Sequence, residues 1–411
     1  MASLLVRTLL VLVCAFAALS ASAAAALGLA EERILAFTAL VSVLLLLPFL
    51  YRPRLNRPSG PELVLAALAT GIVLSDLAGS FAILDAKLAL PVLALLAAPN
   101  LARYLPPEEL TRFVWRLLSA YVVATFLYQL FAEPAAVARG YENIVRYDPT
   151  GSVVMHSSLS LIHLIVALAR LGGRLTLPAR VATLVLGSMS LAMVFLTATR
   201  TALLTLALFA LLQVWSAARP DLALRRLAMA GLGLALALLA WTLLVNDSFW
   251  LRLVGGQGDF SSGRFVSIAQ WLTLAGDHPW GMGLGAVREL LADGRPALGG
   301  DAYLEWPHNE FVRLYVESGP PGLMFVTLLL ALLMRRGVQA ARDSADPVLR
   351  ALILAIVADL VAEACLQNLL NAVYHATVLV LILGLAVAGG RRVTVRVPAD
   401  AMPLAQSAAS R

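Results

Sequence analysis

The chain has 411 residues, of which 60% are hydrophobic and only 14% are charged, and its mean hydropathy is +0.84. A soluble domain carries about 25% charged residues, so this composition excludes water as the solvent for most of the surface. Apolar runs of about 20 residues recur along the whole chain, and in lipid such runs are helices, because the backbone must satisfy its own hydrogen bonds. The alternation typical of a membrane β-barrel is absent. We therefore predict an all-α polytopic membrane protein.

About twelve membrane spans are predicted from the apolar runs. Their approximate ranges are 4–28, 34–51, 63–84, 88–104, 113–131, 152–170, 181–198, 201–217, 227–246, 321–334, 351–372 and 375–389. The first run contains Arg7, an apolar stretch and an Ala-rich end, which is also the pattern of a signal peptide. We favour an uncleaved first span, because the distribution of positive charge along the chain requires it.

Arginine is concentrated in alternate connections between the predicted spans, and the segment after Gly390 belongs to the same set. The arginines of these connections are Arg52, Arg54, Arg57, Arg103, Arg112, Arg116, Arg170, Arg174, Arg180, Arg219, Arg225, Arg226, Arg335, Arg336, Arg342 and Arg350. This is the positive-inside pattern, so the net charge of +6 is first a signal of topology, and we expect no nucleic-acid partner. Both termini are expected in the cytoplasm, and in a Gram-negative cell, where this would be the inner membrane, the opposite side is the periplasm.

Four parts follow from this topology. Spans one to nine lie in residues 1–245, a long polar loop that faces the periplasm lies in 246–320, spans ten to twelve lie in 321–390, and a cytoplasmic tail lies in 391–411. The long loop is the segment in which we expect the chemistry. The two cysteines of the chain lie in apolar runs and form no metal or disulfide pattern, and no metal site is predicted.

Two positions in the long loop indicate chemistry. Arg264 opens a helical pattern that runs to Leu274, and an arginine beside the free N–H groups of a helix N-terminus can bind an anion. His308 directly precedes a short amphipathic helix predicted over 309–316. A histidine beside an acidic residue at a membrane surface can act as a general base near neutral pH, but a solvated loop histidine fits the pattern equally well. The glycines of segment 281–285 permit a tight turn.

Arg200 is a second outward arginine. It lies between two apolar runs, on the side of the membrane that otherwise avoids arginine. Its side chain can simply extend to the interface, but an arginine costs about 2.5–3.5 kcal/mol at mid-membrane, and charges in that setting are usually functional. Two outward arginines and a histidine suit a lipid-linked phosphate or diphosphate. Guanidinium groups stabilise a diphosphate leaving group without a metal, and a base deprotonates the attacking hydroxyl.

Several short motifs occur in order in the outward segments. They are Thr199-Arg200-Thr201-Ala202, Ser262-Gly263-Arg264 with Trp271, His278-Pro279 with Gly281-Met282-Gly283, His308-Asn309-Glu310-Phe311, and Glu317-Ser318-Gly319 with Gly322-Leu323. Each motif alone is a weak signal, but their order, spacing and shared outward placement make the combination specific. Over about residues 190–330 the chain resembles the O-antigen ligase and O-antigen polymerase family of bacterial membrane glycosyltransferases.

The resemblance implies a GT-C-like fold and an inverting glycosyltransferase that uses no metal, cofactor or nucleotide sugar. It implies a glycan on undecaprenyl diphosphate as the donor and lipid A–core oligosaccharide as the acceptor, met among membrane lipids at the periplasmic face. Arg200 and Arg264 would hold the diphosphate, and His308 would activate the acceptor hydroxyl, so these three are the expected catalytic residues. The further expected substrate-binding residues are Glu310, Arg313 and His156.

The shared motifs do not separate a ligase from an O-antigen or exopolysaccharide polymerase, or from a protein O-oligosaccharyltransferase. Chain length and the lack of an appended soluble domain favour the ligase. A polysaccharide or lipid transporter is the alternative from another class, and it would use Asp76, Asp359 and Glu363 as a proton relay. For these acids we favour hydrogen bonds between helices, or for Glu363 the wall of the substrate cavity, because they form no paired pattern of broken helices.

Overall fold

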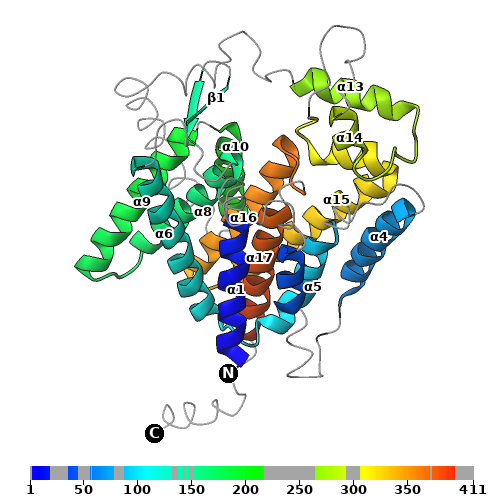
Figure 1. Cartoon of the computed structure of the whole chain (residues 1–411). Coiled ribbons are helices and arrows are strands. Elements are labelled where there is room, and N and C mark those ends of the chain that lie inside the picture. The colour runs from blue at the N-terminus through cyan, green and yellow to red at the C-terminus, as the bar shows by residue number, and fades with distance from the viewer. Residues whose placement is uncertain are drawn as a thin grey trace.

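The computed structural model describes residues 2–18, 36–44, 56, 58–77, 88–131, 138–141, 144–147, 152–197, 199–216, 264–292, 306–370 and 373–393, which form a bundle of helices (Figure 1). Its helices are α1 (Ala2–Ala18), α4 (Gly60–Leu77), α5 (Ala89–Leu101), α6 (Pro107–Phe131), α8 (Val153–Leu171), α9 (Leu177–Thr197), α10 (Arg200–Ser216), α13 (Arg264–Gly276), α14 (Ala286–Ala292), α15 (Glu310–Asp343), α16 (Pro347–Leu366) and α17 (Val373–Val393). Residues 36–44 are also helical.

The other regular element is a short hairpin between α6 and α8. Strand β1 (Ala138–Tyr141) pairs with β2 (Ile144–Tyr147) in antiparallel register, with Arg139 opposite Arg146. The hairpin lies at the same end of the molecule as α13 (Figure 1). Apart from this hairpin, the regular elements among the described residues are helices, as the apolar composition predicts.

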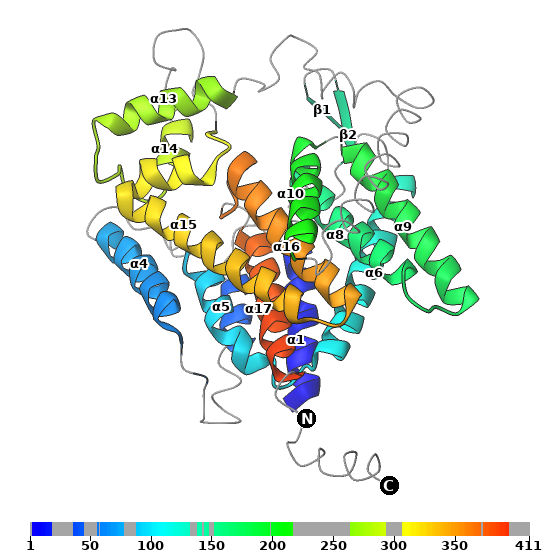
Figure 2. The same cartoon turned by 180° about the vertical axis from the view of Figure 1, so that it is seen from behind.

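Helix α16 lies in the middle of the bundle and packs against α8, α10, α15 and α17 (Figure 2). Every residue from Ala351 to Leu360 is buried, as expected for a helix that is apolar on all sides. Its start is well defined, because the Asp346 carboxylate accepts a hydrogen bond from the Val348 N–H at 2.9 Å and Pro347 occupies the first helical position. The central position of α16 means that polar groups on it must find partners within the protein.

Four helices among the described residues are long and apolar enough to cross a membrane, namely α6, α8, α9 and α15, and shorter apolar helices accompany them. Together with large apolar side chains that stay exposed on the surface, such as Phe131 and Leu177, these helices define an integral membrane protein. The predicted total of twelve spans remains a prediction. The ninth predicted span, 227–246, and the ends of the second, 34–51, lie outside the described residues.

Helix α15 combines the predicted loop helix and the tenth span in one element with a kink. Gly319, at the kink, has φ 60° and ψ −150°, and two prolines follow it. Pro320 and Pro321 lack the N–H groups that would pair with the carbonyls of Val316 and Glu317 four residues earlier. Those carbonyls instead accept hydrogen bonds, each of 2.9 Å, from the backbone N–H groups of residues 282 and 283. The glycine-rich turn thereby repairs the broken helix.

The kink gives a prediction for stability. A Cβ atom at Gly319 would lie 2.7 Å from the carbonyl carbon of Trp280, in a backbone conformation that L-residues rarely adopt. We expect Gly319→Ala to destabilise the protein by about 1–3 kcal/mol, measured as a lower melting temperature of the purified protein in detergent. Gly276→Ala is the control, because nothing lies within 4 Å of its added Cβ. Equal melting temperatures for the two variants would contradict the assigned role of the kink.

Candidate active site

His308 lies in the turn that leads into α15. Its φ of 45° is rare for a residue other than glycine. The next residue, Asn309, caps the helix: its Oδ1 accepts from the Val312 N–H at 3.1 Å, and its Nδ2 donates to the carbonyl oxygen of Cys365 at 3.0 Å. Asn309 therefore joins the start of α15 to the last turn of α16, and this contact places His308 beside the end of α16.

A cavity of about 250 Å³ lies at this junction. Its walls come from the start of α8, the turn before α15 and the end of α16. The lining residues are Ser152, Val154, Met155, Trp306, His308, Glu363, Gln367, Asn368 and Leu369. The cavity thus brings His308 together with two polar side chains of α16, Glu363 and Gln367.

The His308 imidazole is held in its neutral form. Burial lowers the pKa of His308 below its usual value of 6.5, and the positive charge of Arg264 lowers it further, whereas a hydrogen bond with Gln367 acts in the opposite direction. Both of the larger effects disfavour the imidazolium ion. His308 is therefore neutral at pH 7 and keeps a nitrogen lone pair that can accept a proton, which favours the general base over the solvated loop histidine.

Arg264 begins α13, as the helical pattern predicts, and lies close enough to His308 for its charge to influence that imidazole. Helix α13 is anchored by Trp271, which is fully buried in a small cluster with Val316 of α15. The Ser267 hydroxyl donates to the carbonyl oxygen of Trp306 at 3.1 Å, which ties the helix to the segment before His308. Packing and hydrogen bonding thus hold the half-buried Arg264 at the cavity end of the molecule.

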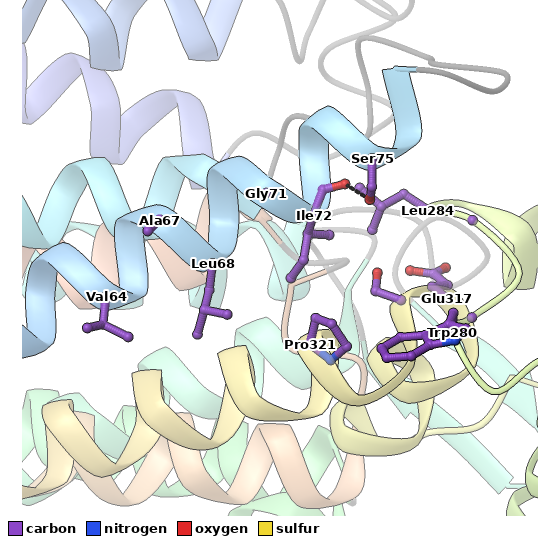
Figure 3. A pocket seen from close by; sticks show the side chains of 13 residues that line it. Val64, Ala67, Leu68, Gly71, Ile72, Ser75, Trp280, Leu284, Glu317 and Pro321 are labelled. Carbon is purple, nitrogen blue, oxygen red and sulfur yellow. Dashed lines mark hydrogen bonds between the residues drawn. The ribbon is translucent and has the colours of Figure 1, made fainter.

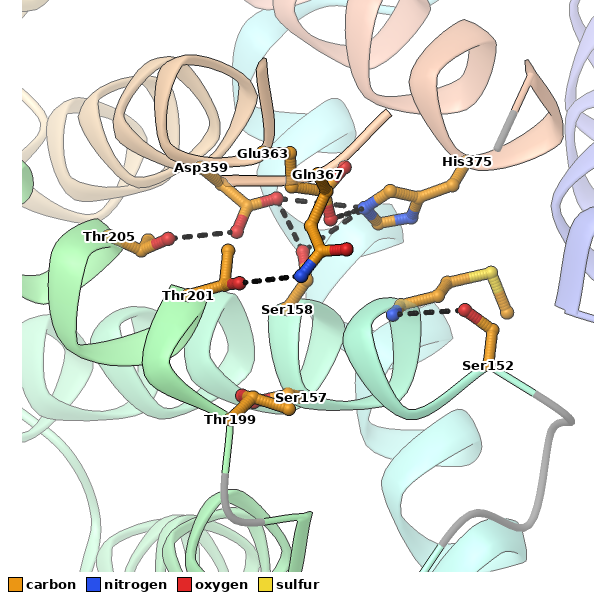
Figure 4. A network of polar contacts seen from close by, with 11 residues as sticks. Ser152, Ser157, Ser158, Thr199, Thr201, Thr205, Asp359, Glu363, Gln367 and His375 are labelled. Atoms are coloured by element: carbon orange, nitrogen blue, oxygen red, sulfur yellow. Dashed lines mark hydrogen bonds and ion pairs between the residues drawn. The ribbon is translucent and has the colours of Figure 1, made fainter. Parts of the chain in front are cut away.

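Arg200 begins α10, and its side chain lies outside the described residues. The following residue, Thr201, accepts a hydrogen bond from the Gln367 Nε2 at 3.3 Å (Figure 4). Because Gln367 also lines the cavity, the start of α10 borders the same site as His308. The three predicted catalytic positions are therefore brought to one region, and the direction of the Arg200 side chain remains a prediction.

We predicted that Glu310 and Arg313 bind substrate, but the environment of these two residues is different from that of a substrate-binding site. Arg313 is 2% exposed, and its guanidinium donates to the carboxylates of Glu310 and Glu317, the latter at 2.6 Å. The second carboxylate oxygen of Glu310 accepts from the backbone N–H of Leu370 at 3.3 Å. None of the three charged residues lines the cavity with His308. Their contacts favour a structural role, in which they join the start of α15 to the link between α16 and α17.

His156, the remaining predicted substrate-binding residue, is completely buried inside the bundle. Its Nδ1 lies 2.9 Å from the Tyr121 hydroxyl, and its Nε2 has no hydrogen-bond partner among the described residues. Its neighbour Met155 lines the cavity, but His156 does not. The geometry therefore places His156 next to the candidate site without bringing it into contact with the cavity.

Buried acids in α16 form a network with α8, α10 and α17 (Figure 4). The His375 Nε2 lies 3.1 Å from Glu363 Oε1 and 3.6 Å from Asp359 Oδ2, and the hydroxyls of Ser158 and Thr205 donate to Asp359. The ligand atoms of Asp359, Glu363 and His375 lie within 4.8 Å of one another and could hold a metal ion. Hydrogen bonds between helices already engage Asp359 and His375, and Glu363 pairs with His375. The predicted absence of a metal remains a prediction. The side chain of Asp76 lies outside the described residues.

A second cavity, of about 680 Å³, lies between α4 and the kink of α15 (Figure 3). Its walls are mainly apolar, with Leu68, Ile72, Trp280 and Pro321 among them. Glu317 is the one titratable residue among its lining residues, and the buried ion pair with Arg313 already engages that carboxylate. The smaller cavity with His308 is therefore the better candidate for acid–base chemistry.

The fold and the site describe an integral membrane protein with a polar cavity near one end of its helical bundle. Residues 182–327, about a third of the chain, match the family model described as O-antigen ligase. The match supports the predicted resemblance to the O-antigen ligase and polymerase family, whose members are glycosyltransferase-like. The matched segment contains Arg200, Arg264 and His308. No curated protein matches the chain.

The environment of His308 gives a prediction for its titration. Arg264→Ala removes a positive charge that opposes protonation, so we expect the pKa of His308 to rise in this variant. Histidine NMR of the labelled protein in detergent measures the shift. Arg112→Ala is the control, because Arg112 is exposed on α6 and its charge is not among the causes of the His308 shift. An unchanged pKa of His308 in Arg264→Ala would show that the two residues do not share a site.

Proposed function

We propose that the chain is an O-antigen ligase. It is an inverting, metal-independent glycosyltransferase that moves O-antigen polysaccharide from undecaprenyl diphosphate to lipid A–core oligosaccharide at the periplasmic face of the inner membrane. The observation that carries the proposal is the neutral His308 in a cavity, with the charge of Arg264 nearby and the start of α10 at its border. This arrangement provides a base for a hydroxyl acceptor beside positive charge for an anionic leaving group.

The reaction is a single displacement. The acceptor hydroxyl transfers its proton to His308 as its oxygen forms a bond to the anomeric carbon of the donor glycan. The bond between that carbon and the diphosphate oxygen breaks, and undecaprenyl diphosphate leaves with the electron pair. Arg264 and Arg200 stabilise the negative charge of the leaving group through charge-assisted hydrogen bonds. One displacement at the anomeric carbon inverts its configuration.

The positive charge of Arg264 gives the site an order of events. In the free protein, burial lowers the pKa of His308 and this charge lowers it further. A bound diphosphate offsets the charge of Arg264, so the pKa of His308 rises and the imidazole becomes a stronger base once the donor is present. The base is therefore strengthened in the complex that holds the donor, where proton transfer is required.

The same chemistry serves a polymerase or a protein O-oligosaccharyltransferase, which differ from the ligase in the acceptor alone. The transporter has weaker support. Its proposed relay residues, Asp359 and Glu363, are engaged by partners on α8, α10 and α17. In our proposal about twelve spans in a GT-C-like arrangement carry the site at the outer membrane face, and both termini lie in the cytoplasm.

Single substitutions test the proposal. His308→Ala removes the base, and we expect the rate of transfer to fall by about 10²–10⁴-fold. Arg264→Ala and Arg200→Ala each remove stabilisation of the leaving group, and we expect loss of detectable transfer. The measurement is transfer from a lipid-diphosphate oligosaccharide to core oligosaccharide by the purified protein. His278→Ala is the matched control, because His278 is exposed in the same outward segment and has no assigned role.

The same variants identify the acceptor when they are expressed in a strain that lacks the gene. For a ligase, the inactive variants leave lipopolysaccharide that consists of the core alone, while lipid-linked polymer accumulates. Core with a single repeat would point to a polymerase. Unchanged lipopolysaccharide would reject both and point to another acceptor. Normal transfer by His308→Ala, Arg264→Ala and Arg200→Ala would reject the proposed site itself.

A further inference from the structure

Three polar residues in and directly after α16 follow one another at intervals of four. The first two share one face of the helix, and the third is the extended residue that caps its C-terminal end. They are Asp359, Glu363 and Gln367, which we call the α16 polar stripe. Asp359 lies deep in the bundle and is 1% exposed, whereas Glu363 and Gln367 reach the cavity that contains His308. The stripe thus connects the interior of the bundle to the candidate active site (Figure 4).

The stripe also holds the start of α10 at two points. The Thr205 hydroxyl donates to Asp359 Oδ1 at 3.2 Å, and Gln367 Nε2 donates to the Thr201 hydroxyl at 3.3 Å. A third contact comes from α8, where Ser157 accepts from the Thr199 hydroxyl at 2.6 Å. Thr199, Thr201 and Thr205 are all buried. The segment on both sides of Arg200 is therefore held by side-chain hydrogen bonds to neighbouring helices.

Asp359 is itself held from three sides. Besides Thr205 of α10, it accepts from Ser158 of α8 and lies 3.6 Å from the His375 Nε2 of α17. A carboxylate inside an apolar bundle is costly, whereas a single hydrogen bond between membrane helices contributes only about 0.6 kcal/mol on average. A leucine in this position would pack the helices without that cost. The network therefore fixes the position of α10 relative to α16. A contribution to stability alone does not account for the buried carboxylate.

Gln367 links this placement to the catalytic base. Its amide contacts Thr201 on one side, and on the other it lines the same cavity as His308. One side chain therefore lies between the residue that follows Arg200 and the cavity of the imidazole that we propose as the base. A shift of α10 would change the distance between these two catalytic positions.

We propose that the α16 polar stripe is a positioning element of the transfer reaction, in which Asp359 and Gln367 hold the start of α10 so that Arg200 and His308 act on the same donor. The inference rests on the proposed function of those two residues. The stripe residues Asp359 and Gln367 act through Arg200 and His308, and they are positioning residues with no direct part in bond formation. A misplacement of about 1 Å at a reacting centre can reduce a rate by as much as 100-fold.

The test uses the hydroxyl of Thr205. Thr205→Val keeps the shape of the side chain but removes its hydrogen bond to Asp359, and we expect kcat/KM for the lipid-diphosphate donor to fall by about 10-fold or more. Thr205→Ser restores the hydroxyl and is expected to recover most of the activity. Thr183→Val is the matched control, because Thr183 is also buried in a membrane helix but donates to the carbonyl of Ala179 in its own helix.

A double-mutant cycle with Arg200→Lys separates positioning from folding. If Thr205 acts through Arg200, the loss in kcat/KM of the double variant is smaller than the product of the two single losses. Losses that multiply, or equal activities of Thr205→Val and Thr183→Val, overturn the inference. If Thr205→Val does not fold, Gln367→Met goes through the same cycle. Normal activity of Arg200→Lys, Arg264→Ala and His308→Ala would instead reject the proposed function, so the two failures are distinguishable.

Discussion

Helix α16 carries two carboxylates and an amide into an apolar bundle, where each needs a partner from a neighbouring helix. An unpaired carboxylate there would cost more free energy than a single packing contact could offset. The partners come from three directions: Ser158 of α8, Thr205 of α10 and His375 of α17. Because the polar side chains of α16 need these partners, they constrain how α8, α10 and α17 are placed around it. The candidate site lies where the same polar face reaches the end of the bundle.

The segment that contains α13 and α14 is joined to this bundle through α15. Two prolines after Gly319 leave two carbonyls of the helix without their usual partners, and the N–H groups of the glycine-rich turn supply replacements. Since that turn follows α13 directly, the repair also determines where α13 lies. The buried charges of Glu310, Arg313 and Glu317 pair within the first turns of α15, and Glu310 joins these turns to the link between α16 and α17. Backbone repair and ion pairing thus place Arg264 and His308 together.

Local signals in the sequence were sufficient for several parts of this arrangement. The helix that begins at Arg264, the helix that follows Asn309 and the turn at the glycines of segment 281–285 were all predicted correctly, because caps and glycines act on neighbouring residues. The burial of Arg313 was not predicted. An arginine in an amphipathic outward helix suggests an exposed side chain, and only the fold brings two carboxylates to it.

Two further features depend on contacts between distant residues. The repair of the kink in α15 was missed: the prolines indicate the break between the loop helix and the tenth span, but the N–H groups that compensate for it lie more than thirty residues earlier in the chain. Gln367 was missed although it lies within the predicted span 351–372, because its contact with Thr201 joins residues that are far apart in the sequence. Its spacing of four from Glu363 was the available signal, and it becomes informative once Asp359 is recognised as the first residue of the same face.

The central claim is that the segments of Arg200, Arg264 and His308 form one site for a lipid diphosphate. A cryo-electron microscopy structure of the protein in lipid nanodiscs with undecaprenyl diphosphate tests this claim most directly. We expect the diphosphate to lie within hydrogen-bond distance of the guanidinium groups of Arg200 and Arg264, beside the cavity lined by His308. A diphosphate bound away from these arginines, for example in the apolar cavity between α4 and the kink of α15, would contradict it.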